Sequence, residues 1–432
     1  MNKKGIALFF FVMTTLLALA ADDDTKWPQQ TIECKPWTRW WWFGSAVDEK
    51  NLTYNIGKLG EAGIGGVEIT PIYGVKGYED KYIPYLSPKW MNMLSYTHNQ
   101  AQKWGMQVDM NNGTGWPFGG PDVTLDNAAC KAIFQEYHVS GNKETNLKIR
   151  VNDQKQQGIA RLSRLMAYSD KGEKIDLTML VNQDGTLKWK APTGEWRLLA
   201  LFEGRTLQQV KRAAPGGEGY VMDHLDANAV KNYLHKFDNA FATNHTPYPH
   251  TFFNDSYEVY GANWSPTLLQ EFYKRRGYKL ENYFPELLDK GKTDRSRRVI
   301  SDYRETLGEM LEENFTQQWT NWAHAHGAIT RNQAHGSPAN LINLYADVDI
   351  PECEIFGISD FNIPSLRKDS LIKKNDGDPI TLKFASSAAH ISGKKFTSAE
   401  TFTWLTEHFR TSLSQCKPEI DQMFTSGVNH VF

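Results

Sequence analysis

The sequence predicts an α/β protein built on a (β/α)8 TIM-like barrel that lacks its eighth helix and carries a small antiparallel β insertion. Three observations support this prediction. Eight short apolar runs each end in polar residues, helix-like segments separate most of these runs, and the alternation breaks once, between residues 130 and 222. Strands that alternate with helices are typical of a parallel sheet, and eight such units is the number that closes a barrel.

Length and composition are compatible with this fold. The chain has 432 residues, of which 40% are hydrophobic and 23% are charged, so it can bury a large core. Its 48 basic and 50 acidic residues give a net charge of −2. A protein without excess positive charge is unsuited to binding the nucleic-acid backbone through bulk charge, so we expect no nucleic-acid partner. Aromatic residues reach 12%, and their flat faces can stack against sugar rings as well as fill a core.

Residues 1–21 predict a secretory signal peptide. Lys3 and Lys4 precede an apolar run from Ile6 to Ala21 that ends in small residues, which is the pattern of a signal peptide with its cleavage site. An N-terminal anchor helix is the alternative, although the run is short for a bilayer. No later segment has the composition of a membrane span. Because of the predicted signal peptide, we expect an exported protein.

The first part of the barrel is expected over residues 22–129. Three apolar runs at 38–44, 65–70 and 106–111 predict strands, and amphipathic segments at 52–62 and 89–104 predict the helices between them. Alternating segments joined by Asn-Asp and Asp-Gly turns then predict the antiparallel β insertion over 130–222.

The second part of the barrel is expected over residues 223–432. Its five predicted strands lie at 250–258, 328–336, 347–354, 395–400 and 427–432, and its predicted helical segments lie at 267–325, 382–390 and 404–424. The eighth predicted strand is the end of the sequence. This ending predicts a barrel without its eighth helix, and it leaves open the alternative of a truncated, inactive chain that at most binds sugar.

The active site of such a barrel lies at the C-terminal ends of its strands. Acidic residues end several of the predicted strands, and glycosidic bond cleavage needs one protonated and one ionised carboxyl group. Strands four and seven face each other across the barrel, so Glu258 and Glu400 are the predicted catalytic pair, with Glu354 as a third candidate. The candidate substrate-binding residues are Trp42, Glu68, Asn112, Trp116, Asp255, Asn332, His335 and His430.

The sequence resembles glycoside hydrolase family 106, the α-L-rhamnosidases, from about residue 37 to residue 432. Six motifs carry the resemblance: RWWW at 39–42, GIGGVEI at 63–69, NGTGWP at 112–117, VKRAAPGGEG at 210–219, DSYE at 255–258 and SAETFT at 398–403.

This resemblance implies a (β/α)8 catalytic domain that cleaves terminal α-L-rhamnosidic bonds in plant pectin by an inverting mechanism. It also implies a calcium ion that helps to hold the sugar, without identifying its ligands, and a periplasmic location in a Gram-negative bacterium. By motif position, Glu258 is the implied general acid and Glu400 the implied base, with Glu354 as the alternative base. Carboxyl groups about 6.5–9.5 Å apart would fit inversion, whereas about 5 Å would fit a retaining barrel glycosidase, the second enzymatic alternative.

Overall fold

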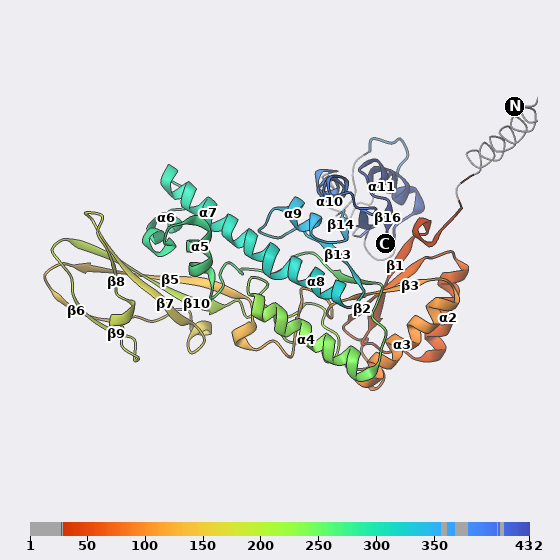
Figure 1. The fold of residues 1–432 in the computed structure, drawn as a ribbon, viewed down its shortest axis with the longest axis horizontal. Helices are drawn as coiled ribbons and strands as arrows, with labels where there is room; N and C mark the ends of the chain where they lie inside the picture. The colour runs from red at the N-terminus through yellow and green to blue at the C-terminus, as the bar shows by residue number, and fades with distance from the viewer. Residues whose placement is uncertain (1–26, 28, 356–360, 368–378, 404, 407–409) are drawn as a thin grey trace, which may run out of the picture. The chain divides into compact units, whose positions relative to one another are not determined.

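The computed structural model describes residues 27, 29–355, 361–367, 379–403, 405–406 and 410–432 (Figure 1). The predicted signal peptide, residues 1–21, lies outside the described residues. The chain divides into two compact units, Met1–Lys35 and Pro36–Phe432. The described part of the first unit contains a short 3-10 helix, Ile32–Cys34. In the part of the chain that the structure describes, no helix combines the length and apolarity needed to cross a membrane.

An eight-stranded parallel sheet forms the centre of the second unit (Figure 1). In sheet order its strands are β1 (Trp37–Phe43), β2 (Gly66–Ile72), β3 (Gln107–Asn111), β12 (Thr251–Asn254), β13 (Ile329–Gln333), β14 (Ile350–Glu354), β15 (Ser398–Glu400) and β16 (His430–Val431). The ring of Trp37 in β1 lies 5.2 Å from that of His430 in β16, so the first and last strands approach each other. The sheet is therefore a nearly closed barrel, and all eight predicted strands are confirmed.

The sequence of β2 explains how tightly this sheet is packed. All seven of its residues are buried, as expected for a parallel strand that is covered on both faces. Gly66 lies opposite Trp37 of β1, and a Cβ atom at Gly66 would lie 2.4 Å from the Trp37 ring. Glycine at this position therefore leaves room for the large indole to pack over the neighbouring strand.

The helices begin where their capping residues predict. Asp48 accepts a hydrogen bond from the backbone N–H of Asn51 at the start of α2 (Glu49–Glu61). Ser87 accepts one from Trp90 at the start of α3 (Pro88–Lys103), whose first residue is proline. Both helices were predicted from their amphipathic pattern, and the structure confirms them.

Helix α4 (Ala227–Asn244) was not predicted. Asp226 caps it, and its buried residues Val230, Tyr233, Phe237 and Phe241 recur at helical spacing. This pattern is the signal that could have identified the helix from the sequence.

The long helical region predicted for 267–325 is divided into several elements: α5 (Leu268–Arg276), the 3-10 helix η6 (Leu280–Tyr283), α6 (Phe284–Leu288), α7 (Asp294–Leu311), the π-helix η7 (Glu312–Gln317) and α8 (Gln318–Ala325). Helix α5 ends because Gly277 adopts a left-handed conformation with φ of 76°. The π-helix joins α7 directly to α8, so these three elements form one continuous rod.

Three further helices follow β13 in the part of the chain that the structure describes. They are α9 (Leu341–Ala346), α10 (Pro379–Ile391) and α11 (Leu413–Thr425). Helix α9 was not predicted, whereas α10 covers the predicted segment 382–390. Helix α11 begins later than the predicted residue 404, at Leu413, where Ser412 and Gln415 form a capping box.

The segment after β3 forms antiparallel sheets. One sheet has the order β5 (Cys130–Ser140), β10 (Glu195–Arg205), β7 (Arg161–Ser169), β8 (Lys174–Asp176), and Figure 1 shows β5, β7 and β10 side by side. A second pairs β6 (Glu144–Lys148) with β9 (Thr186–Lys190), and a third pairs β4 (Gly119–Gly120) with β11 (Tyr220–Val221). The hydroxyl of Tyr168 donates a hydrogen bond of 2.5 Å to the carbonyl of Glu281, which ties β7 to η6.

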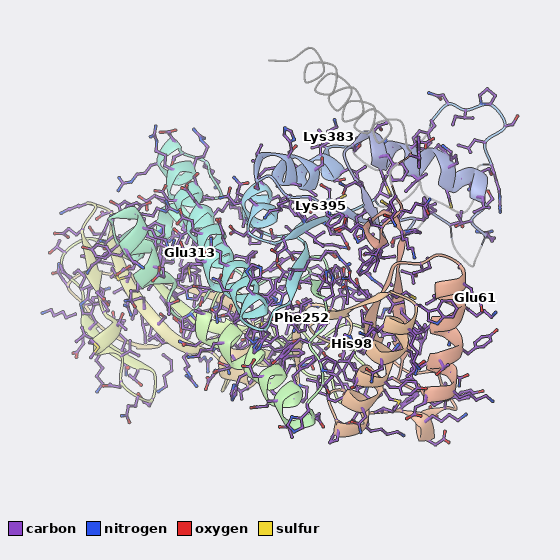
Figure 2. The ribbon with its side chains drawn as sticks, turned by 45° about the vertical axis from the view of Figure 1, so that its right-hand side comes forward. Glu61, His98, Phe252, Glu313, Lys383 and Lys395 are labelled. Atoms are coloured by element: carbon purple, nitrogen blue, oxygen red, sulfur yellow. The ribbon has the colours of Figure 1, made fainter. Side chains whose placement is uncertain are left out.

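Aromatic side chains fill the space between the barrel and its helices. Phe252 of β12 packs against Phe241 of α4 and Trp322 of α8, with ring centroids 6.2 and 4.9 Å away, and Figure 2 shows it among densely packed side chains. This core holds the strands rigidly, and their C-terminal ends carry the candidate site.

Candidate active site

Polar side chains converge at the C-terminal edge of the sheet. Gln333, Glu354 and Glu400 are the last residues of β13, β14 and β15, and Asp255 directly follows β12. Glu354 and Glu400 are paired across neighbouring strands. Since the strands are parallel, their ends meet at one mouth of the barrel, which is where barrel enzymes place their active sites.

A fully buried arginine forms the floor of this mouth. Arg331 of β13 lies 3.0 Å (Nη1) from Asp109 Oδ2 and 2.8 Å (Nε) from Glu352 Oε2, and it also pairs with Glu68. Burial lowers the pKa of Arg331 to about 10, against the opposing influence of Glu352 and others. The guanidinium therefore stays charged at neutral pH, and its three partners hold it in one orientation.

Arg39 connects this floor to the carboxylates at the mouth. Its Nε lies 3.0 Å from Glu68 Oε1, while its Nη1 lies 3.0 Å from Glu400 Oε2 and 3.5 Å from Asp255 Oδ2. Arg39 belongs to β1, so one cation contacts acidic residues of β2 and β15 and one that follows β12. This arrangement depends on the near closure of the barrel.

Glu400 is stabilised as a carboxylate. Burial alone would raise its pKa, but Arg39 and hydrogen bonds from Gln333 and Thr403 outweigh burial and lower it. The Gln333 amide donates at 2.8 Å, and the Thr403 hydroxyl also donates at 2.8 Å. Glu400 is therefore ionised at neutral pH, as a general base must be.

Glu354 and Asp255 have the opposite tendency. Burial raises the pKa of Glu354 to about 10, and the negative charges of Glu400 and Asp255 contribute in the same direction. Burial also raises the pKa of Asp255 to about 7, although Arg39 opposes this change. His335 Nε2 lies 3.2 Å from Glu354 Oε2. Glu354 therefore keeps its proton at neutral pH, in contrast to Glu400.

Glu258 lies on the loop after β12 and has its own partners. Lys211 contacts its carboxylate, and the hydroxyl of Tyr260 donates a hydrogen bond to it at 2.6 Å. Burial would raise the pKa of Glu258, but these two partners outweigh burial and lower it. Burial lowers the pKa of His335, which Glu400 and Glu258 act to raise. Both carboxylates therefore lie close enough to influence one imidazole.

The other predicted site residues are distributed over several levels. Trp116 lies at the mouth, where its ring is 6.3 Å from that of Trp41. Glu68 belongs to the floor, and the buried side chain of Asn332 accepts a hydrogen bond of 2.7 Å from Asn254. The structure thus brings Glu258, Asp255, His335, Glu354 and Glu400 to one mouth together with Trp116, with Glu68 beneath them.

Three predicted substrate-binding residues lie away from the mouth. Trp42 is buried against Trp90 of α3, with ring centroids 5.6 Å apart. Asn112 is buried too, and its side chain accepts a hydrogen bond of 2.9 Å from Trp319. His430 packs among aromatic rings near the start of β1, where burial lowers its pKa to about 3. These placements leave no exposed polar face for a sugar at these three positions.

Four residues that contact the acidic side chains of the mouth and floor were not predicted from the sequence: the cations Arg39, Arg331 and Lys211, and the amide Gln333. Arg39 lies within an otherwise apolar strand, and a charged residue in such a strand requires a buried partner, so this signal was readable. Arg331 and Gln333 belong to β13, which was correctly predicted as a strand. Lys211 lies in an irregular segment, and its contact with Glu258, 47 positions along the chain, has no signature in one sequence.

The donor chemistry of the mouth suits a hard cation such as calcium, which prefers carboxylate oxygens. Asp255 and Glu354 supply such oxygens, and burial, together with the neighbouring charge of Glu400, raises the pKa of both. Among the described residues, no group of three or more His, Cys, Asp and Glu side chains is arranged to hold a metal ion. The two carboxyl groups could supply at most part of a calcium ligand set.

Comparisons with known proteins give a family match, a curated relative and a solved structure of similar fold. A family model described as alpha-L-rhamnosidase, glycoside hydrolase family 106, matches residues 27–164 and 151–432. A curated relative, a putative beta-glucuronidase of Formosa agariphila, is 25% identical over an alignment of 427 positions, and the match covers 87% of this chain and 34% of that protein. The solved rhamnosidase of Novosphingobium sp. PP1Y shares the fold with a TM-score of 0.72 at 16% identity, covering 93% of this chain and 56% of that one. The chain thus spans about a third of the curated relative and little more than half of the solved rhamnosidase.

Proposed function

This chain belongs to glycoside hydrolase family 106, the alpha-L-rhamnosidases, and from that premise we propose that it hydrolyses terminal α-L-rhamnosidic bonds by an inverting mechanism. One observation carries the proposal: acidic side chains from distant strands, Asp255, Glu354 and Glu400, meet at one barrel mouth around Arg39 and His335. Glycosidic cleavage by inversion needs two carboxyl groups at one site, a proton donor and an ionised base.

We assign the general base to Glu400. A base must be ionised before it can take a proton from the attacking water. Arg39, Gln333 and Thr403 lower the pKa of Glu400, whereas burial raises that of Glu354 to about 10. These opposite shifts support Glu400 over Glu354 as the base.

We assign the general acid to Glu258, on the loop after β12. Its carboxyl shares the environment of His335 with Glu400, which supports a common substrate site. Lys211 and Tyr260 keep Glu258 ionised in this structure, so the assignment requires that substrate binding weaken these contacts. The protonated state of Glu354 makes it the second candidate for the proton donor.

The mechanism then uses two carboxyl groups on opposite sides of the sugar. Glu258 gives its proton to the glycosidic oxygen as that bond breaks, and Glu400 takes a proton from the water that attacks the anomeric carbon. We expect the two carboxyl groups to lie about 6.5–9.5 Å apart in the substrate complex, which leaves room for that water.

The test is hydrolysis of 4-nitrophenyl α-L-rhamnoside, followed by NMR of the first sugar product. We expect β-L-rhamnose to form first. Initial release of the α anomer would indicate a retaining glycosidase instead. Because the curated relative is named a putative beta-glucuronidase, 4-nitrophenyl β-D-glucuronide is the matched second substrate, and turnover of the glucuronide alone would reject the proposal.

We further propose that calcium takes part in substrate binding. Asp255 and Glu354 would hold the ion, and its positive charge would stabilise the ionised form of these two buried carboxyl groups, whose pKa values burial raises. A pectin-type plant polysaccharide as the natural substrate, together with export to the periplasm, completes the proposal. The N-terminal pattern of residues 1–21 supports export.

A further inference from the structure

Alternate residues of β1 point into the barrel. Trp37 contacts the ring of His430 near the lower end, and Arg39 lies in the carboxylate layer above it. Trp42, on the other face of the strand, packs against α3. Because successive side chains of a strand alternate between faces, Trp41 and Phe43 share the face of Arg39 and lie above it at the mouth.

Four aromatic side chains form a continuous row along this rim, which we call the aromatic ribbon: Trp116, Trp41, Phe43 and Tyr73. Successive ring centroids are separated by 6.3, 6.4 and 6.0 Å. Phe43 is 44% exposed and Tyr73 is 43% exposed. Large aromatic side chains left open to solvent beside a candidate site are informative, because folding alone would favour burying them.

One end of the ribbon lies at Glu258. The Trp116 side chain is close enough to contribute to lowering the Glu258 pKa, after burial and the larger effects of Lys211 and Tyr260. The backbone of Trp116 also pairs with that of Lys211, which contacts the Glu258 carboxylate. The first ring of the ribbon is therefore next to the proposed proton donor.

The other end of the ribbon lies at Tyr73 and Arg212. The Tyr73 backbone N–H donates a hydrogen bond of 2.9 Å to the Arg212 carbonyl, and the Arg212 guanidinium lies 5.4 Å from the centre of the Tyr73 ring. Arg212 has no carboxylate partner among the described residues, so its N–H groups can reach oxygen atoms of a ligand. The adjacent residues Lys211 and Arg212 thus connect the two ends.

The position of the ribbon relative to Glu258 identifies its occupant. A general acid lies beside the oxygen of the leaving group, so the sugar residues that leave lie on its side of the site. Flat aromatic faces match the apolar C–H faces of sugar rings. We propose that the aromatic ribbon binds the leaving-group sugars, and that the substrate is therefore an oligosaccharide or polysaccharide with several residues beyond the terminal rhamnose. This inference rests on the proposed function.

The test compares two substrates that differ only in the length of the leaving group: an α-L-rhamnosyl disaccharide and an α-L-rhamnosyl tetrasaccharide of the same chain. For each of the variants Phe43→Ala and Tyr73→Ala, we expect kcat/KM on the tetrasaccharide to fall about tenfold, because one contact between an aromatic ring and a sugar is lost. On the disaccharide, we expect kcat/KM to change by less than about twofold. Tyr54→Ala is the matched control, since Tyr54 is 63% exposed on α2, and it should change neither value.

Two results would overturn the inference: equal losses on both substrates, which would indicate a structural role, or no loss on either. If the wild-type chain cleaves neither substrate, the proposed function fails separately. Calorimetric binding of the tetrasaccharide then decides the matter, because weaker binding by the Phe43→Ala/Tyr73→Ala double variant supports the ribbon and unchanged binding rejects it.

Discussion

At the scale of single residues, Arg331 is a fully buried cation with three buried carboxylate partners. Replacing it with methionine would leave Glu68, Asp109 and Glu352 buried without their shared cation. Removing one partner of a buried ion pair costs about 3–5 kcal/mol, so we expect Arg331→Met to lower the free energy of unfolding by about that amount in urea titrations.

Arg298 is the matched control for this prediction. It pairs with Asp294 at 2.8 Å, but both side chains are open to solvent. We expect Arg298→Met to leave the urea midpoint nearly unchanged. Similar midpoints for the two variants would mean that Arg331 is not the electrostatic centre of the floor.

The assignment of the general acid predicts how Glu258→Gln depends on the leaving group. A substrate with a poor leaving group needs a proton from the enzyme, so its cleavage should fall by about 10²–10⁴-fold. An activated aryl rhamnoside leaves without that proton and should retain much of its rate. The measurement is kcat/KM on both substrates.

Glu400→Gln and Glu354→Gln complete this series. Loss of the base should reduce cleavage of both substrates equally in Glu400→Gln. The role of acid would belong to Glu354 instead if Glu354→Gln lowered kcat/KM mainly on the substrate with the poor leaving group and Glu258→Gln lowered it equally on both substrates.

Asp223 predicts a pH dependence of stability. Burial raises its pKa to about 8, so the folded state keeps a proton that the unfolded state releases from about pH 4 upward. The stability that depends on this proton is present in acid and is lost as pH rises towards 8. We expect Asp223→Asn to increase the melting temperature relative to the wild type at pH 8, and to do so much less at pH 4. A difference that does not depend on pH would contradict this account.

At the scale of elements, most of the fold follows from periodicity. The eight barrel strands and the early helices α2 and α3 have clear apolar patterns and capping residues. Helix α4 was missed although Asp226 and its buried aromatic residues carry a readable pattern. The predicted helical region 267–325 is divided into separate elements by the left-handed Gly277 and by the π-helix. The glycine could have been identified from the sequence as a helix end, whereas the π-helix could not.

The candidate site was predictable only in part. Acidic residues at strand ends could be read directly, because parallel strands place their C-terminal ends at one mouth. The protonation states could not be read, since they depend on Arg39 and Lys211 reaching carboxylates far along the chain. Trp42 was predicted to bind substrate but packs against Trp90 of α3, because the face of β1 that carries Arg39 points into the barrel and the partners of Arg39 were not recognised in the sequence.

Two glycines test the packing of these elements. A Cβ at Gly66 would lie 2.4 Å from the Trp37 ring, whereas a Cβ at Gly57 in α2 would meet Trp104 at an ordinary 3.7 Å. We expect Gly66→Ala to destabilise the fold by about 1–3 kcal/mol, because it forces the sheet to shift. Gly57→Ala should be neutral or stabilise α2 by up to about 1 kcal/mol. Denaturant unfolding of both variants measures the difference, and equal effects would contradict the tight β1–β2 contact.

At the scale of the whole molecule, the excess of acids at the mouth predicts a response to calcium. Bound calcium stabilises the folded state by mass action, so the melting temperature should rise with added calcium after chelation, and hydrolysis should recover with it. Asp255→Asn and Glu354→Gln should weaken both responses. Magnesium is the control ion, since it prefers a smaller octahedral shell. Unchanged melting and activity after exhaustive chelation would remove calcium from the proposal.

The ion pair between Arg39 and Glu400 joins residues 361 positions apart in the sequence. Contacts between such distant segments form late in folding, because the loop between them must first be ordered. A nascent or partly unfolded chain can therefore fold its early helices while its acidic cluster is still unassembled. Catalytic activity would then appear only when β1 and β15, which carry Arg39 and Glu400, come together. Enzymatic turnover would therefore report on the last folding step.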